Sequence, residues 1–236
     1  MITHFANSRG MANHGWLQSA HTFSFADYYN PERMNFGTLR VINDDTIAAG
    51  SGFGRHSHRD MEIITIPIEG SLRHEDSEGN RGVISRGEVQ VMSAGTGIFH
   101  SEHSDEKQTT KLLQIWVLPK KLGVKPRYDQ KKIPLDQRQN SFELVVSPDG
   151  REGSLAINQD AFFSLAEFSK STELEYKPKL TSNGAYVFIL HGTFDINGIH
   201  FSSRDGIGFS SFDKIKLKSI DGPGEILIME LPMDLS

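Results

Sequence analysis

The sequence contains no cysteine among its 236 residues. This absence excludes disulfide bonds, thiolate nucleophiles and metal sites with sulfur ligands. Any metal in this protein must therefore be held by nitrogen and oxygen ligands, which points to histidine, aspartate and glutamate side chains.

Long apolar segments and clusters of positive charge are missing as well. Residues 1–20 contain neither the apolar region of a signal peptide nor a span long enough to cross a bilayer. The formal net charge is −5, and no stripe of lysine and arginine is interleaved with aromatic residues, so direct binding to nucleic acid or to a membrane is not expected. We therefore expect a cytoplasmic protein with a small or uncharged partner.

Helical periodicity is the third feature that the sequence lacks. Its apolar runs are short and rich in β-branched and aromatic residues, as in "EIITIPI", "LLQIWVL" and "AYVFIL". Turn signals separate these runs, among them "SRDG", "DGPG" and the acidic "DSEGN" at residues 76–80, which we predict to be a hairpin turn. The pattern predicts an all-β protein built as a barrel or sandwich.

One segment divides the chain into two parts. Residues 119–141 contain three prolines and five lysines, with almost no apolar periodicity, which is typical of a connecting segment. The parts on either side repeat one order of strands and turns, in which a strand ends at Gly70 or Gly192 and a later strand follows "SR" and a glycine. This repetition predicts a duplicated β module.

The first part carries histidines at strand spacing. Residues two apart in a strand project to the same side, so His56 and His58 form one pair, and His100 and Glu102 form another. Three imidazoles and a carboxylate suit Fe(II), Mn(II), Ni(II), Cu(II), Co(II) or Zn(II), and in an octahedral arrangement they leave two positions for substrate and O2. Glu62 has the same parity as His58, so spacing alone leaves it open as the carboxylate ligand.

The residues around these histidines resemble the two cupin motifs. Residues 50–62 match G(X)5HXH(X)3–4E(X)6G, and the final glycine, Gly70, comes one residue later than the motif asks. The second motif, G(X)5PXG(X)2H(X)3N, fits in two pieces: residues 87–95 fit its first part with Ser93 in place of the proline, and Gly97 to His100 fits G(X)2H two residues later than a continuous match would require. The terminal asparagine is missing.

Several longer stretches are similar to the pirin family, a branch of the cupin superfamily. They include "HGWLQSAHTFSFADYYNP", "LRVINDD" and "VQVMSAGTGIFHSE", and the resemblance covers residues 7–118 densely and the rest loosely. It implies an all-β bicupin of two double-stranded β-helix (jelly-roll) barrels that exchange strands at the N-terminus. The expected division is an N-terminal cupin at residues 1–118, a connecting segment at 119–141, and a degenerate C-terminal cupin at 142–236.

The same resemblance implies the ligand set His56, His58, His100 and Glu102, and it favours Glu102 over Glu62. We expect one divalent transition metal, with Fe(II) first and Zn, Ni, Mn, Co or Cu as alternatives. The second part is expected to hold no metal, because the positions that correspond to the three histidines are Pro178, Leu180 and Ser219. His191 and His200 are expected to be ordinary strand residues.

The function implied by the resemblance is a metal-dependent dioxygenase of the quercetin 2,3-dioxygenase type. It would open the ring of a flavonol such as quercetin with O2 and release carbon monoxide, with Glu102 accepting the proton of the 3-hydroxyl group. The alternative is a non-enzymatic, redox-sensitive regulatory protein that binds a protein partner. We expect a monomer in either case.

Overall fold

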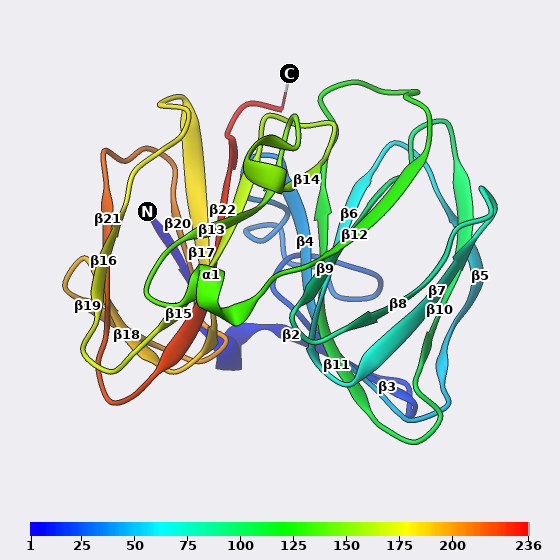
Figure 1. The fold of residues 1–236 in the computed structure, drawn as a ribbon, viewed down its shortest axis with the longest axis horizontal. Coiled ribbons are helices and arrows are strands. Elements are labelled where there is room, and N and C mark those ends of the chain that lie inside the picture. The colour runs from blue at the N-terminus through cyan, green and yellow to red at the C-terminus, as the bar shows by residue number, and fades with distance from the viewer. Residues whose placement is uncertain (236) are drawn as a thin grey trace.

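The computed structural model describes residues 1–235, and their regular structure is almost entirely β. The chain forms two barrels that lie side by side (Figure 1). In each barrel a seven-stranded sheet is combined with a four-stranded sheet. The predicted all-β, two-barrel architecture is confirmed.

The first barrel contains the strands from β2 to β12. Its seven-stranded sheet has the spatial order β12 (Arg127–Lys132), β9 (Glu88–Ser93), β6 (Glu62–Glu69), β11 (Thr110–Val117), β4 (Leu39–Ile47), β3 (Leu17–His21) and β2 (Gly10–Asn13). Its four-stranded sheet has the order β5 (Gly52–His58), β10 (Ile98–Ser104), β7 (Ser71–Asp76) and β8 (Arg81–Ser85).

The second barrel repeats this plan. Its seven-stranded sheet has the order β1 (Ile2–His4), β20 (Gly206–Phe209), β17 (Asn183–His191), β22 (Gly224–Pro232), β15 (Phe162–Phe168), β13 (Glu143–Ser147) and β14 (Leu155–Ala156). Its four-stranded sheet has the order β16 (Glu173–Tyr176), β21 (Ile215–Ser219), β18 (Thr193–Ile196) and β19 (Ile199–Ser202). Helical structure is limited to α1 (Leu135–Arg138) and the 3-10 helices η1 (Ala6–Ser8) and η2 (Arg151–Gly153) within the described chain.

The two seven-stranded sheets pack against each other in the middle of the molecule. Ile64 and Ile66 of β6 share one apolar core with Phe163 and Leu165 of β15. The alternate residue Ile63 packs inside the first barrel instead. These central strands are thus buried on both faces. This explains why their sequences are nearly continuous apolar runs and do not alternate between apolar and polar residues.

Two segments cross the expected boundaries. Strand β1 pairs with β20, so residues 2–4 belong to the sheet of the second barrel, as the expected strand exchange requires. Strand β12 lies within the connecting segment and extends the first barrel by pairing with β9. Its sequence "RYDQKK" has no apolar periodicity because the strand lies at the exposed edge of the sheet.

No helix among residues 1–235 is long and apolar enough to cross a membrane.

The exchanged N-terminal strand is fastened by a buried polar contact. His4 Nδ1 lies 2.8 Å from the Tyr186 hydroxyl, and both side chains are buried. The two rings also contact Phe23, with ring centroids 5.4 Å from His4 and 5.8 Å from Tyr186. This contact connects β1 to β17 at the apolar core between the two barrels.

Tyr186→Phe should therefore lower the free energy of unfolding by about 1–3 kcal/mol, because it leaves a buried imidazole nitrogen without a partner. Equilibrium unfolding in urea measures the loss. Tyr29→Phe is the matched control, since Tyr29 is 72% exposed and its change should stay within about 0.5 kcal/mol. Equal stability of the two variants would contradict this role of Tyr186.

Candidate metal centre

Three histidines of the four-stranded sheet gather inside the first barrel. The ring centroids of His56 and His100 are 4.3 Å apart, and His58 lies 4.9 Å from each of them. One nitrogen of each ring lies within 4.8 Å of the others. The structure thus brings the three predicted histidines into one cluster from two neighbouring strands.

A bulge in β5 aims His56 at this cluster. His56 is opposite His100 and Phe53 is opposite Glu102, so two residues of β5 stand against one residue of β10. The bulge leaves the Gly54 carbonyl 2.8 Å from His56 Nδ1. A carbonyl only accepts, so Nδ1 of His56 donates the hydrogen bond and Nε2 keeps the lone pair that a metal needs.

The electrostatics of the cluster favour the neutral form of His58 and His100. Burial, with the neighbouring histidines, lowers the pKa of His100 to about 2, and burial and His56 lower the pKa of His58 to about 4. His100 Nε2 is buried and has no hydrogen-bond partner within residues 1–235. Unpaired lone pairs on buried, neutral imidazoles fit a divalent transition metal.

Glu102 lies on the His100 side of the cluster. Its side chain is buried, Oε2 accepts a 3.0 Å hydrogen bond from Gln114 Nε2, and Oε1 has no partner in the described part of the chain. One oxygen of this carboxylate lies within 4.8 Å of a nitrogen of His100 and of a nitrogen of His74. Glu102 does not form such a group with His56 and His58. Burial raises the pKa of Glu102 to about 7, and the nearby Asp45 adds to this rise.

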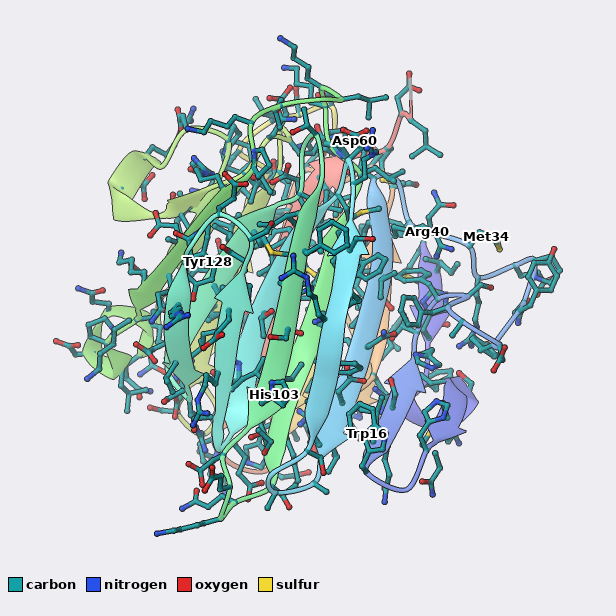
Figure 2. All side chains as sticks on the ribbon, turned by 90° about the vertical axis from the view of Figure 1, so that its right-hand side faces the viewer. Trp16, Met34, Arg40, Asp60, His103 and Tyr128 are labelled. Atoms are coloured by element: carbon teal, nitrogen blue, oxygen red, sulfur yellow. The ribbon has the colours of Figure 1, made fainter. Side chains whose placement is uncertain are left out.

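Glu62 points away from the histidines. Its carboxylate accepts a 2.6 Å hydrogen bond from Ser93, and it has the strand parity of Ile64, which faces the second barrel. Parity could not be carried over from His58, because a turn at residues 59–61 separates β5 from β6 and contains Asp60 with a positive φ of 47° (Figure 2). The spacing between His58 and Glu62 therefore could not show which way the Glu62 side chain points.

A cavity of about 200 Å³ opens beside His56, His58 and Glu102. Part of its wall is aromatic: Trp116 contacts His58 at 4.9 Å and Phe25 at 5.3 Å between ring centroids. The N-terminal part of the wall is built by residues that include His14, Leu17 and Phe53. The cavity joins the histidine cluster to a surface that suits a flat aromatic molecule.

Polar side chains form the other part of the cavity wall. Ser19 donates a short hydrogen bond to Asp45, and His21 Nδ1 lies 2.7 Å from Asn43 Oδ1. Burial raises the pKa of Asp45 to about 7, although the hydrogen bond from Ser19 opposes the rise. These residues are buried on β3 and β4, so the cavity offers hydrogen-bonding groups in addition to aromatic side chains.

Sequence reasoning did not single out this polar row. Asn43, Asp45 and Gln114 interrupt apolar strands, in "VINDDTI" and "LLQIWVL". A polar residue at an inward position of a buried strand needs a partner, so it is itself a signal of a site or a buried network. The sequence contained these polar residues but did not show which side chains they contact.

The second barrel has no comparable cluster within the described residues, where both groups of metal-ligating side chains belong to the first barrel. Its interior is filled by apolar side chains such as Phe168, Phe194 and Phe201. His191 and His200 are exposed, and His200 lies 3.6 Å from Asp195. This arrangement agrees with the loss of ligand residues noted in the sequence.

Comparisons with known proteins cover both barrels. Residues 4–117 match the family described as Pirin, and residues 144–231 match the family described as Quercetinase C-terminal cupin domain. The quercetin 2,3-dioxygenase of Escherichia coli strain K12 is 43% identical over 228 residues, which is 96% of each chain. A pirin-like protein of Caulobacter vibrioides is 39% identical over 220 residues, covering 93% of this chain and 94% of that protein.

A solved structure gives the same result in three dimensions. The bacterial pirin YhhW from Escherichia coli, in complex with nickel(II), superimposes with a TM-score of 0.92 at 42% sequence identity. The match covers 98% of this chain and 98% of that chain. The similarity therefore extends over the barrel that contains the histidine cluster and over the one that lacks it.

Loss of a residue that only supports a metal ligand usually weakens metal binding by roughly 10–100-fold. His56→Ala removes one of the three clustered imidazoles themselves, so it should weaken nickel binding by more than this. Calorimetric titration of the metal-free protein with Ni(II) measures both affinity and stoichiometry, and we expect one ion per wild-type chain. His200→Ala, at an exposed histidine of the second barrel, is the control and should bind like the wild type. Equal affinities in the two variants would disprove the cluster as the metal site.

Asp45→Asn should change how stability depends on pH in the metal-free protein. Because the folded-state pKa of Asp45 is raised from 3.8 to about 7, its protonation stabilises the fold fully below pH about 4, and this stabilisation is lost as pH rises through 7. Between pH 4 and pH 8, the free energy of unfolding of the asparagine variant should therefore rise by roughly 1–4 kcal/mol relative to that of the wild type. Urea unfolding across this range tests it, with the exposed Asp27→Asn as control; a constant difference between Asp45→Asn and wild type would contradict the expectation.

Proposed function

Because the chain belongs to the pirin family, we propose that it is a metal-dependent dioxygenase that opens the ring of a flavonol such as quercetin and releases carbon monoxide. The observation that carries this proposal is the position of three clustered imidazoles and a buried carboxylate beside an aromatic cavity. The name of the Escherichia coli relative, quercetin 2,3-dioxygenase, supports the substrate class.

The proposed metal ligands are His56, His58, His100 and Glu102. When bound, a divalent ion would supply Lewis acidity and a template for the two reactants. We propose Fe(II) as the ion, and Ni(II) is an alternative supported by the nickel complex of the relative from Escherichia coli. Zn(II), Mn(II), Co(II) and Cu(II) also suit an N/O donor set, in which availability rather than affinity decides occupancy.

The cavity walls would bind and orient the flavonol. Trp116 and Phe25 offer aromatic faces and edges to a flat ring system. The polar row of Asn43 and Asp45 offers hydrogen-bond partners for phenolic hydroxyl groups. A flavonol that fills the cavity would displace water from the histidine cluster, which would protect its reactive, deprotonated form from side reactions.

Glu102 is the proposed base for the 3-hydroxyl proton. Gln114 holds Oε2, so Oε1 is the oxygen left to take the proton or to contact the ion. In the proposed reaction both atoms of O2 enter the ring-opened ester, the two bonds of carbon 3 to its ring neighbours break, and carbon 3 leaves with its oxygen as carbon monoxide. The flavonol supplies all the electrons, so no external reductant is required.

We also propose that residues 1–118 are the catalytic unit, that 119–141 connect the barrels, and that 142–236 support the first barrel without binding metal. The shared apolar core of the two seven-stranded sheets supports this division of labour. A monomer acting in the cytoplasm remains our proposal from composition and charge.

Glu102→Gln should keep much of its metal but lose flavonol turnover by about 10²-fold or more, the usual contribution of a positioned base. Oxygen uptake and carbon monoxide release with quercetin, measured on metal-loaded protein, test this. Glu62→Gln makes the same chemical change at a buried carboxylate that faces the second barrel, and it should have a much smaller effect.

Full turnover by Glu102→Gln with metal retained would eliminate Glu102 as the base. A wild type that binds metal stoichiometrically and consumes no oxygen with quercetin would instead sink the proposed reaction. That second result would favour the redox-sensitive regulatory protein considered from the sequence.

A further inference from the structure

A fourth histidine lies directly behind His100. His74 on β7 is fully buried, and its ring centroid lies 5.3 Å from that of His100. Its other face stacks on Tyr128 of β12 at 4.5 Å, on the side of the barrel away from Trp16 (Figure 2). The Nδ1 atoms of His74 and His100 are 3.5 Å apart. Only one of these two nitrogens can carry a proton if they form a hydrogen bond.

The partners of His74 decide which of its nitrogens carries the proton. Nε2 lies 3.2 Å from Asp76 Oδ2, and a carboxylate only accepts, so Nε2 donates. Gln90 Nε2, an amide donor, lies 3.4 Å from Nδ1. Nδ1 of His74 must therefore present its lone pair to the donors around it.

This arrangement determines the tautomer of His100. Since His74 Nδ1 is an acceptor, the 3.5 Å contact between the two rings is a hydrogen bond only when His100 Nδ1 carries the proton. The lone pair of His100 is then on Nε2, the buried atom that has no partner among residues 1–235. The other tautomer would place two lone pairs against each other and a proton where a metal would bind.

Asp76 is itself held firmly in place. Its Oδ1 accepts hydrogen bonds from the backbone nitrogens of Glu78 and Asn80, each 3.0 Å long, and the Asn80 amide donates to both carboxylate oxygens. The same turn is fastened to β10 by Ser77, whose backbone nitrogen donates to the Phe99 carbonyl at 2.8 Å. The "DSEGN" stretch is thus a hairpin turn whose first residue reaches towards the cluster.

We propose that Asp76 and His74 are positioning residues, which hold His100 in the tautomer that can bind a metal through Nε2. Neither residue belongs to the proposed ligand set. Carboxylates and carbonyls that accept the second N–H of a metal-bound histidine tune many metal sites, and here a second imidazole stands between the carboxylate and the ligand. The inference rests on the proposed metal site and is independent of the proposed oxidation of flavonols.

Asp76→Asn tests the proposal with little change in shape. The asparagine oxygen, placed at Oδ1, can still accept from the Glu78 and Asn80 backbone and from the Asn80 side-chain amide, which gives up its second contact at Oδ2. The new amide group then donates to His74 Nε2. His74 would then carry its proton on Nδ1 and push the proton of His100 to Nε2. We expect nitrogen NMR of the metal-free protein to show His100 with its proton on Nδ1 in the wild type and on Nε2 in the variant.

Nickel binding provides the second readout. Competition with a chelating dye should show Ni(II) bound 10–100-fold more weakly by Asp76→Asn than by the wild type. Glu78→Gln is the matched control, because it removes the same charge from an exposed side chain of the same turn. Its nickel affinity and its His100 tautomer should equal those of the wild type.

The inference is overturned if His100 carries its proton on Nε2 in the wild type, a measurement that needs no variant. It is equally overturned if Asp76→Asn keeps the wild-type tautomer, or if it binds nickel as tightly as Glu78→Gln. A wild type that binds no nickel would overturn the proposed metal site together with this inference. A wild type that binds nickel and oxidises no flavonol would overturn the proposed reaction alone.

Discussion

Burial of the first barrel's seven-stranded sheet on both faces is the constraint on which the rest of the structure depends. One face packs on the second barrel through residues such as Ile64 and Leu113, and the other face lines the cavity through Gln114 and Trp116. Alternate side chains of each strand therefore face two different environments, the second barrel and the cavity. Glu62 on one face is thus buried towards the second barrel, whereas Gln114 on the other face lines the cavity.

Two buried glutamates of the first barrel lie in different surroundings. Glu62 and Glu102 are both almost fully buried, and burial raises the pKa of both carboxyl groups. Glu62 faces the second barrel and is held by Ser93, whereas Glu102 faces the cavity and is held by Gln114. Both residues are carboxylates, but Glu62 lies on β6 of the seven-stranded sheet, whereas Glu102 lies on β10 of the four-stranded sheet, the strand that also carries His100.

The second barrel contributes by packing rather than by chemistry. It supplies half of the central apolar core, and it takes the N-terminal strand β1 into its own sheet through pairs such as Ile2 with Gly208. Its carboxylate Glu230 is fully buried and accepts hydrogen bonds from Tyr176 and from the backbone of Lys179 and Leu180. A carboxylate with this many internal donors stabilises a loop and has no capacity left for a ligand.

The sequence by itself determined the β content, the duplication and the histidine pairs, because all three are written in short-range periodicity and in motif spacing. Tertiary structure alone decided that Glu102 lies beside His100 and that Glu62 faces the second barrel, since a turn between two strands resets the alternation that the spacing argument assumed. It also decided the contacts of Asp45, His74 and Asp76, which lie on different strands from the three clustered histidines. Contacts of this kind depend on strand register and sheet packing, and neither is encoded in the local order of residues.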